Sequence, residues 1–407
     1  MNTELMAKIE SLEAQMTETL GEMISYPAIS PLDGGVGEYH KVQYILKKVK
    51  ELGFTDVKVL SSPDPKAAGG VRPNVIVRMS GRSSKRLWIV AHTDVVPEGE
   101  RSMWHTDPFK AVVKDGRIYG RGVSDNGEEV ISSLYALDAI KELGLTPEYD
   151  VNLAFVADEE LGSKHGIRFL LKEGIFKKDD LVVVPDMGSE DGDLIEVAEK
   201  SICWIEFTLT GKQSHASMPD MGINACRAAN AFSYSLDNAL HETFPERDNL
   251  FQPPYSTFEP TKRRANVPNI NTAPGVEVFC FDCRVLPTVP LEEVLKVVDA
   301  EIKKAEEKYG VKITYTFPQY GQAPAPTPAD APVVTALLDA VKEVLPNIIP
   351  KSIGVGGGTC AAYFRKEGIP AAVWGQESDC AHMPNEYTKL EHLVSEAKVF
   401  ATMMLGK

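Results

Sequence analysis

The chain has 407 residues, a length that exceeds one compact core and favours two domains. Hydrophobic residues make up 43% and charged residues 25% of the sequence, values that are typical of folded proteins and exclude general disorder. The net charge of −15 comes without a basic stripe, which excludes a nucleic-acid-binding surface, and no apolar run approaches the roughly 20 residues that span a bilayer.

The first half of the chain alternates short apolar strands with amphipathic helices. This alternation predicts an α/β domain with a mostly parallel central sheet that helices cover on both faces. The N-terminal helix is charged and lacks the uninterrupted apolar stretch of a signal peptide, so we expect a cytoplasmic protein. The expected strands are 74–79, 87–91, 151–156 and 181–184, and the expected helices are 4–24, 41–52, 128–143 and 165–172.

The middle of the chain has a different order of elements. It predicts the β-α-β-β-α-β arrangement of a small ferredoxin-like α+β domain. Its elements are expected at 202–210, 222–240, 265–272, 276–286, 291–309 and 311–317. A proline-rich stretch at 321–332 marks the exit from this unit, and the α/β pattern then resumes with helices at 333–345 and 390–405 around a strand at 371–374. We therefore expect a discontinuous α/β domain, 1–200 and 319–407, with an inserted domain at 201–318.

Six cysteines are few for this length and fit a reducing compartment. Cys280 and Cys283 form a C-x-x-C pair inside one expected strand. An odd separation on a strand places the two side chains on opposite faces. We therefore expect neither a shared metal nor a disulfide between them.

Metal-competent side chains follow three of the expected strands. His92 and Asp94 end the first, the acidic run 158–160 follows the second, and Asp186 follows the third. Ligands in open parallel sheets collect at the carboxyl ends of strands. Asp125, in a glycine-rich loop, and His382 complete the set if their loops are neighbours. Imidazole nitrogens and carboxylate oxygens without a thiolate suit zinc.

Each of these residues also has a purely structural interpretation. Asp125 could cap the helix that begins near Glu128, and the acidic run could be a solvated surface. His382 and Asp186 could belong to ordinary loops and turns. The joint pattern at the strand ends is what favours a metal centre.

The motifs around these residues are distinctive. HTDVVP, GRGVSD, DEELGS, GKQSHAS, GVGGGT and AHMPNE occur in this order along the chain. In this respect the sequence resembles the di-zinc metallohydrolase family of aminoacylases, acetylornithine deacetylase, succinyl-diaminopimelate desuccinylase and glutamate carboxypeptidase. The resemblance extends over essentially the whole chain.

The resemblance implies a role for each residue of the strand-end cluster. Asp125 would bridge two divalent metal ions, which are expected to be Zn²⁺, with Co²⁺ or Mn²⁺ able to substitute. His92 and Asp186 would complete one site, and Glu160 and His382 the other. Asp94 would accept a hydrogen bond from the far nitrogen of His92, and Glu159 would be the general base. The resemblance also implies a cis peptide bond after Asp125.

The inserted domain would supply helper residues and serve as a dimerisation and lid domain. His215 would stabilise the oxyanion from the partner subunit, which implies a homodimer. Arg284 would hold a substrate carboxylate in a bidentate contact. Asn271 and the segment Gly357, Gly358 and Thr359 would help to position that group. Glu386 is expected to be a structural or solvent-exposed residue.

The expected reaction is hydrolysis of the amide bond of an N-acyl amino acid, of the succinyl-diaminopimelate desuccinylase or acetylornithine deacetylase type. A dipeptidase or carboxypeptidase of the same family is the alternative, since Asp rather than Glu at position 186 is closer to the peptidases. Cys360 stands where many relatives have an acidic residue, so the interaction that the acid makes in those relatives is not expected here.

Two other classes of function remain for comparison. A non-catalytic amino-acid-binding relative has no need of a base such as Glu159. A nucleotide-dependent enzyme would require a phosphate loop, and GVGGGT lacks the lysine and spacing of one. We therefore expect the chain to bind a small amino-acid derivative or short peptide, and to bind neither nucleic acid nor a membrane.

Overall fold

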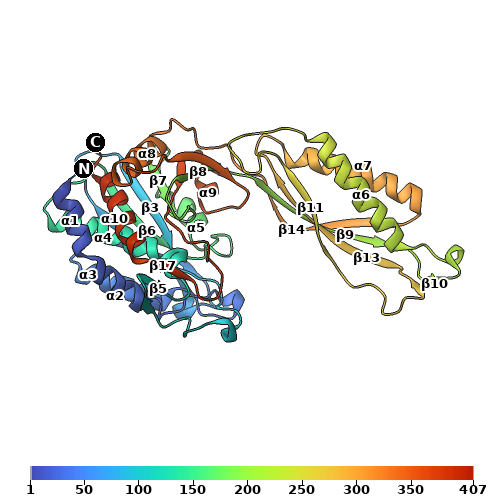
Figure 1. Cartoon of the computed structure of the whole chain (residues 1–407), viewed down its shortest axis with the longest axis horizontal. Helices are drawn as coiled ribbons and strands as arrows, with labels where there is room; N and C mark the ends of the chain where they lie inside the picture. The colour runs from blue at the N-terminus through green and yellow to red at the C-terminus, as the bar shows by residue number, and fades with distance from the viewer. Residues whose placement is uncertain (1, 407) are drawn as a thin grey trace. The chain divides into compact units, whose positions relative to one another are not determined.

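The computed structural model describes residues 2–406, which divide into two compact units. Of the described residues, the large unit comprises 2–197, 327–353 and 359–406, and the small unit comprises 198–326 and 354–358 (Figure 1). In the described part of the chain, no helix is both long and apolar enough to cross a bilayer.

The centre of the large unit is an eight-stranded sheet in the order β1-β2-β6-β3-β7-β16-β8-β15. Its inner strands β6, β3, β7 and β16 are parallel, which confirms the predicted parallel centre. The pairs β1/β2, β2/β6 and β8/β16 are antiparallel. β1 and β2 are consecutive in the chain, and antiparallel pairing lets such strands connect without a crossover helix. The strands are β1 (Val57–Pro63), β2 (Val71–Met79), β3 (Arg86–His92), β6 (Asp150–Val156), β7 (Leu181–Val184), β8 (Leu194–Glu199), β15 (Lys351–Val355) and β16 (Ala371–Val373).

Helices cover the sheet, with α4 and α10 to one side and α5 and α9 to the other (Figure 1). The buried core under α5 and α9 contains Trp88 and Val90, which alternate along β3 as one face of a strand must. The helices of this unit are α1 (Thr3–Ser11), α2 (Glu13–Met23), α3 (Tyr39–Glu51), α4 (Glu128–Glu142), α5 (Ile167–Lys172), α8 (Pro332–Val344), α9 (Ala361–Lys366) and α10 (Leu390–Leu405). A three-stranded sheet contains β4 (Val112–Lys114), β5 (Arg117–Tyr119) and β17 (Tyr387–Lys389).

The N-terminal segment differs from the single expected helix. The chain turns at Leu12, which separates α1 from α2. Leu12 itself is buried, as are Ile9 and Met16 on either side of it. The apolar spacing therefore continues through the turn, which is why the pattern alone predicted one helix.

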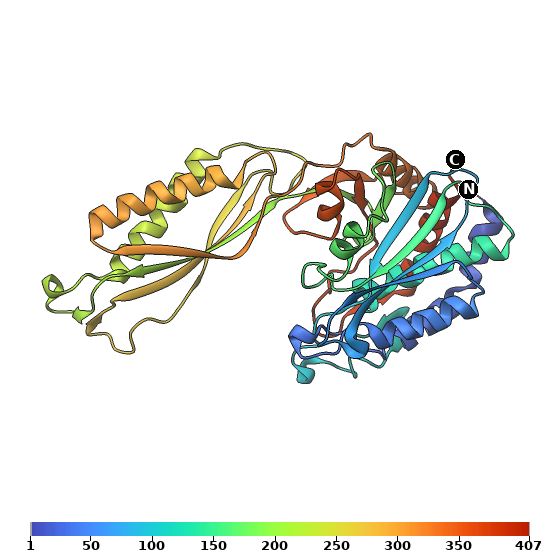
Figure 2. The ribbon, with the colours of Figure 1, turned by 180° about the vertical axis from the view of Figure 1, so that it is seen from behind.

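The small unit has the predicted β-α-β-β-α-β order. Its antiparallel sheet has the strand order β11-β13-β9-β14, and α6 and α7 lie on one face of it (Figures 1 and 2). The elements are β9 (Ser201–Thr210), α6 (Ala225–Thr243), β11 (Thr257–Arg263), β13 (Val276–Val285), α7 (Leu291–Tyr309) and β14 (Lys312–Gly321). Phenylalanines from both central strands and α6 fill the core between the sheet and the helices.

One strand of this unit was predicted in the wrong place. The second strand is β11, and the expected segment 265–272 is an exposed loop that ends at β12 (Thr272–Ala273). β11 contains Pro260, which lowered its apparent strand propensity, but a register shift between Pro260 and Lys262 accommodates the proline. β12 pairs with β10 (Ser214–His215) in a two-stranded sheet.

The C-x-x-C pair lies on β13 as expected. Cys283 is buried and Cys280 is half-buried, in keeping with opposite faces of the strand. All six cysteines are free thiols.

Candidate metal centre

Three parallel strands of the large unit end in the side chains that the sequence singled out. His92 is the last residue of β3, the acidic run 158–160 follows β6, and Asp186 comes just after β7. Because these strands are parallel neighbours, their carboxyl ends share one edge of the sheet. Nε2 of His92 lies 3.2 Å from Oδ1 of Asp186.

Asp125 lies between two histidines. Its Oδ1 is 2.8 Å from Nε2 of His92, and its Oδ2 is 3.1 Å from Nε2 of His382. One carboxylate oxygen thus faces each imidazole, as a carboxylate shared by two ions would require. The Asp125–Asn126 peptide bond is cis, as the resemblance implied.

Glu160 completes the second half of the cluster. Its Oε2 lies 3.1 Å from Nε2 of His382. Its other oxygen, Oε1, is buried and has no hydrogen-bond partner. A buried carboxylate oxygen without a partner is costly, and a cation at this point would compensate it.

The ligand atoms form two overlapping groups. Those of His92, Glu159 and Asp186 lie within 4.8 Å of one another, and so do those of His92, Asp125 and Glu160. This set of imidazole and carboxylate atoms fits a pair of divalent cations. Glu159, expected as a base, is thus also within reach of the ions that His92 and Asp186 would hold.

The electrostatics of the cluster follow from its burial. Burial, and after it the charge of Asp186, raises the pKa of Glu159 well above its usual range. Hydrogen bonds with Asp125 and Glu160 raise the pKa of His382 to about 10. Burial alone would raise the pKa of Asp125, but the hydrogen bonds from His382 and His92 outweigh it and keep that pKa below its usual range. Metal binding must displace the histidine protons, because only neutral imidazole is a ligand.

Asp94 supports the cluster from behind. Its carboxylate accepts hydrogen bonds from the backbone N–H groups of Glu159, at 3.0 Å, and Glu160, at 3.1 Å. The expected partner, Nδ1 of His92, lies 3.5 Å from the Asp94 carboxylate and 3.0 Å from its backbone carbonyl. Asp94 therefore orients both the histidine and the two adjacent glutamates.

Glu386, expected to be structural, holds the loop that carries Asp125. It is fully buried and accepts hydrogen bonds from the backbone N–H groups of Gly122, Ser124 and Asp125, at 2.9–3.2 Å. It also forms an ion pair with the buried Arg121, at 2.5 Å. Burial raises the pKa of Glu386 to about 7, although the charge of Arg121 opposes this.

Arg121 extends this support to the second loop. Its Nη2 donates to the backbone carbonyl of His382 at 3.2 Å. Both members of this ion pair lie in motifs of the sequence, Arg121 in GRGVSD and Glu386 at the end of AHMPNE. Their pairing across more than 260 residues could not be deduced from either motif alone.

Two further residues that sequence reasoning missed connect the strand ends. The side chain of Asn126 accepts from the backbone N–H of His92, at 3.0 Å, and donates to the carbonyl of Pro185, at 2.6 Å. The buried carboxylate of Glu38 pairs with Arg72 and accepts from the backbone N–H of Asp158. These contacts fix where the metal-competent loops leave the sheet.

The predicted helper residues His215 and Asn271 belong to the small unit. His215 is exposed on β10, and Asn271 directly precedes its partner strand β12, so the two residues are close neighbours. The backbone N–H of Ser217 donates to Nδ1 of His215 at 3.2 Å. Because a backbone N–H can only donate, Nδ1 accepts here, and Nε2 is the ring nitrogen left to donate.

Arg284 is engaged within the small unit. Its Nε and Nη2 donate to the two carboxylate oxygens of Asp282, at 2.7 and 3.1 Å, because residues two apart on a strand share a face. Its Nη1 donates to the carbonyl of Gly356 at 2.8 Å, next to the predicted Gly357 and Gly358. Thr359 lies in the large unit, where its Oγ1 accepts from the backbone N–H of Ala361 at the start of α9.

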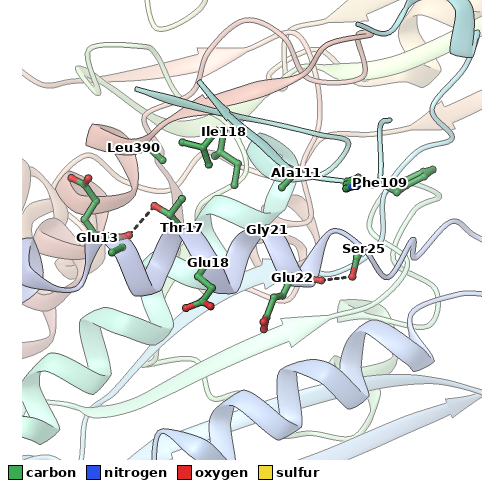
Figure 3. Close-up of a pocket in the computed structure, with 13 residues that line it drawn as sticks. Glu13, Thr17, Glu18, Gly21, Glu22, Ser25, Phe109, Ala111, Ile118 and Leu390 are labelled. Carbon is green, nitrogen blue, oxygen red and sulfur yellow. Dashed lines mark hydrogen bonds between the residues drawn. The ribbon is translucent and has the colours of Figure 1, made fainter. Parts of the chain in front are cut away.

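A separate groove of about 740 Å³ lies between α2 and the β4–β5 hairpin (Figure 3). Its lining includes Thr17, Gly21, Phe109 and Ile118. Three glutamates of α2 lie along it, but it contains no residue of the metal-competent cluster. The reaction chemistry is therefore assigned to the strand ends and not to this groove.

Known proteins share both the sequence and the fold of this chain. Residues 88–406 match the sequence family described as Peptidase family M20/M25/M40. The chain is 42% identical over 398 residues to an uncharacterised metallohydrolase of Methanocaldococcus jannaschii. The aligned region covers 93% of this chain and 96% of that protein. It is 27% identical over 398 residues to a succinyl-diaminopimelate desuccinylase of Rickettsia bellii, with 96% of each chain covered. A solved structure of a Staphylococcus aureus tripeptidase has the same fold, with a TM-score of 0.74 at 20% identity over 96% of this chain and 97% of that one.

Proposed function

Because this chain belongs to peptidase family M20/M25/M40, as its motifs predicted, and is therefore a metal-dependent hydrolytic enzyme, we propose that it removes the acyl group of an N-acyl amino acid. The reaction is hydrolysis of an amide bond, of the desuccinylase or deacetylase type. The products are a carboxylate and a free amine. The observation that carries the proposal is the convergence of His92, Asp125, Glu160, Asp186 and His382 at one edge of the sheet.

We propose two Zn²⁺ ions for this centre. Asp125 would be shared, with His92 and Asp186 on one side and Glu160 and His382 on the other. The unpartnered oxygen of Glu160 and the absence of thiolates from the donor set support this assignment. When bound, such ions polarise the substrate carbonyl and lower the pKa of water.

Glu159 moves the proton in the proposed reaction. It takes a proton from the attacking water as the new carbon–oxygen bond forms, and it delivers that proton to the leaving nitrogen as the carbon–nitrogen bond breaks. Burial raises the pKa of its carboxyl group well above the usual range, which favours the protonated form that delivers the proton to the leaving nitrogen. Asp94 keeps the Glu159 side chain directed at the centre through the backbone N–H contact.

The small unit would supply the remaining contacts. The Nε2 proton of His215 would stabilise the oxyanion in the site of a partner subunit, so we propose a homodimer. Arg284 would bind the substrate carboxylate in place of Asp282, with Asn271 and the 357–359 segment close to that group. We also propose that the enzyme works in the cytoplasm, which the six free cysteines support.

A substrate panel tests the proposed specificity. Purified enzyme supplied with zinc is assayed with N-succinyl and N-acetyl amino acids and with dipeptides. We expect turnover of the N-acyl amino acids to exceed that of the dipeptides. Turnover of dipeptides alone would instead identify a dipeptidase, the candidate that Asp186 favours.

A further inference from the structure

Four glutamates form a second acidic cluster in the large unit, which shares no residue with the candidate metal centre. Glu128 and Glu129 lie in the first turn of α4, Glu396 lies on α10, and Glu377 follows β16. Glu128, Glu129 and Glu396 are completely buried. The helices α4 and α10 pack against each other, and this packing encloses the cluster.

Three of these carboxylates converge on Gly375. A Cβ atom on Gly375 would lie 3.3 Å from Oε1 of Glu396, 3.5 Å from Oε1 of Glu377 and 3.6 Å from Oε1 of Glu129. The point that a side chain would occupy is therefore surrounded by carboxylate oxygens from three separate segments.

Few hydrogen bonds reach the carboxylates of the cluster. Both carboxylate oxygens of Glu128 and of Glu129 are buried without a hydrogen bond, as is Oε2 of Glu396. The other oxygen of Glu396 accepts from the backbone N–H of Gln376 at 2.7 Å. Burial raises the pKa of Glu129 well above its usual range, and the like charges of Glu396, Glu128 and Glu377 raise it further. Uncompensated buried carboxylates are strongly destabilising.

We propose that Glu129, Glu377 and Glu396 bind a third cation beside Gly375, a structural ion distinct from the metal pair. This ion neutralises the carboxylates and joins α4 and α10 to the segment after β16. α4 begins directly after the loop that carries Asp125, so the ion also braces that loop.

The donor set indicates the kind of cation. Carboxylate oxygens without imidazole select hard cations and not zinc. Among the described residues, only the candidate metal centre brings three ligand atoms of this type within 4.8 Å of one another, so the second cluster has a wider shell. Ca²⁺ accepts irregular oxygen shells at about 2.3–2.6 Å, whereas Mg²⁺ requires a tight octahedron at about 2.0–2.1 Å. We therefore expect a large hard cation, Ca²⁺ or K⁺.

Cation-dependent stability tests the proposal without reference to activity. The full-length protein is first loaded with two equivalents of Zn²⁺. Thermal unfolding is then followed against CaCl₂, KCl or MgCl₂, with choline chloride holding the ionic strength constant. We expect a saturable rise in Tm with Ca²⁺ or K⁺, and calorimetry should give one additional ion per chain. The cation that saturates identifies the ion.

Two variants locate the site. Glu129→Gln preserves side-chain shape and should weaken the additional cation at least tenfold, whereas Glu13→Gln, at an exposed position of α2, should behave as wild type. Gly375→Ala should have the same effect as Glu129→Gln, because its methyl group occupies the cation position and its backbone is not left-handed. Zinc content should stay unchanged in both variants.

Three outcomes would overturn the proposal. One is the absence of saturable cation dependence, which would mean that the cluster is held by protons. Another is a cation-dependent rise in Tm that is as large in both Glu129→Gln and Gly375→Ala as in the wild type. Tighter binding of Mg²⁺ than of Ca²⁺ and K⁺ would contradict the wide shell.

Discussion

Two adjacent glutamates after β6 have different surroundings. Glu160 contacts His382. A carboxylate oxygen of Glu159 lies instead within 4.8 Å of ligand atoms of His92 and Asp186. Both backbone N–H groups donate to the carboxylate of Asp94, which fixes the direction in which each side chain leaves the loop. One glutamate can thus bind an ion while its neighbour handles the proton.

Glu159→Gln tests this division of roles. Glutamine retains the size of the side chain but cannot accept the proton of water. We expect kcat on the preferred amide to fall by about 10²–10⁴-fold, with the metal content unchanged. Metal analysis of the same preparation is the control. Normal turnover by a fully metallated variant would remove Glu159 from the mechanism.

His382 gives a pH dependence at the residue scale. Its pKa is raised from the ordinary value near 6.5 to about 10 in the folded, metal-free protein. The protonated imidazole therefore adds stability that is fully present below about pH 6.5 and is lost as the pH rises through 10. We expect the Tm of metal-free protein to fall across this range.

A His382→Ala variant provides the control for this measurement. It should show a flatter dependence of Tm on pH over the same range. Zinc should also flatten the dependence in the wild type, because the metal replaces the proton. An equally steep fall in the variant would assign the effect to other groups.

At the scale of elements, a buried ion pair joins the two loops that carry Asp125 and His382. Glu386 accepts from three backbone N–H groups of the first loop, and Arg121 donates to the backbone of the second. The loops are far apart in sequence and have few regular elements of their own. Their positions therefore depend on this pair.

Glu386→Gln should loosen the metal centre without removing a ligand. Loss of an outer-shell partner typically lowers metal affinity by about 10–100-fold. We expect that decrease in a zinc competition titration, with two ions still bound at saturation. Glu391→Gln, at an exposed position near the start of α10, should keep the wild-type affinity. Unchanged zinc affinity in Glu386→Gln would show that the loops hold their positions without the pair.

The elements that could be predicted from the sequence are those with strong local patterns. The apolar strands before His92, Asp158 and Asp186 were predicted, and so were the helices 291–309 and 390–405. The strand-end rule was sufficient to bring the metal-competent side chains to one edge of the sheet. β11 was missed because Pro260 weakens its strand pattern, although a shift in register absorbs the proline.

Contacts between distant segments could not be predicted in the same way. Nothing local to Glu386 indicates that it accepts from the loop around Asp125. The convergence of Glu129, Glu377 and Glu396 on Gly375 likewise depends on how α4 and α10 pack. The engagement of Arg284 by Asp282 was readable in principle, since residues two apart on a strand share a face.

At the scale of the whole molecule, the metal-competent edge of the sheet belongs to the large unit, whereas the exposed His215 belongs to the small unit. We propose that a homodimer completes the site in trans. Glu159→Gln and His215→Ala test this together, because each variant lacks a different part of the machinery. Both should be nearly inactive alone.

Mixing the two variants after reversible subunit exchange should restore activity. In random heterodimers one of the two sites has an intact Glu159 and a partner with an intact His215, so about a quarter of wild-type activity should return. Sedimentation of the mixture confirms that the dimers persist. If the mixture has no more activity than its components, His215 does not act across subunits.

The pair of cations at the strand ends is measured most directly by metal content together with activity. The protein is stripped with a chelator, titrated with Zn²⁺, and assayed at each step on its preferred amide. We predict two ions per chain at saturation, with activity that disappears on stripping and returns with the ions. In Asp125→Ala we predict that the binding of two ions and the activity are both lost. Full activity in the stripped protein, or undiminished binding of two ions by Asp125→Ala, would contradict the account.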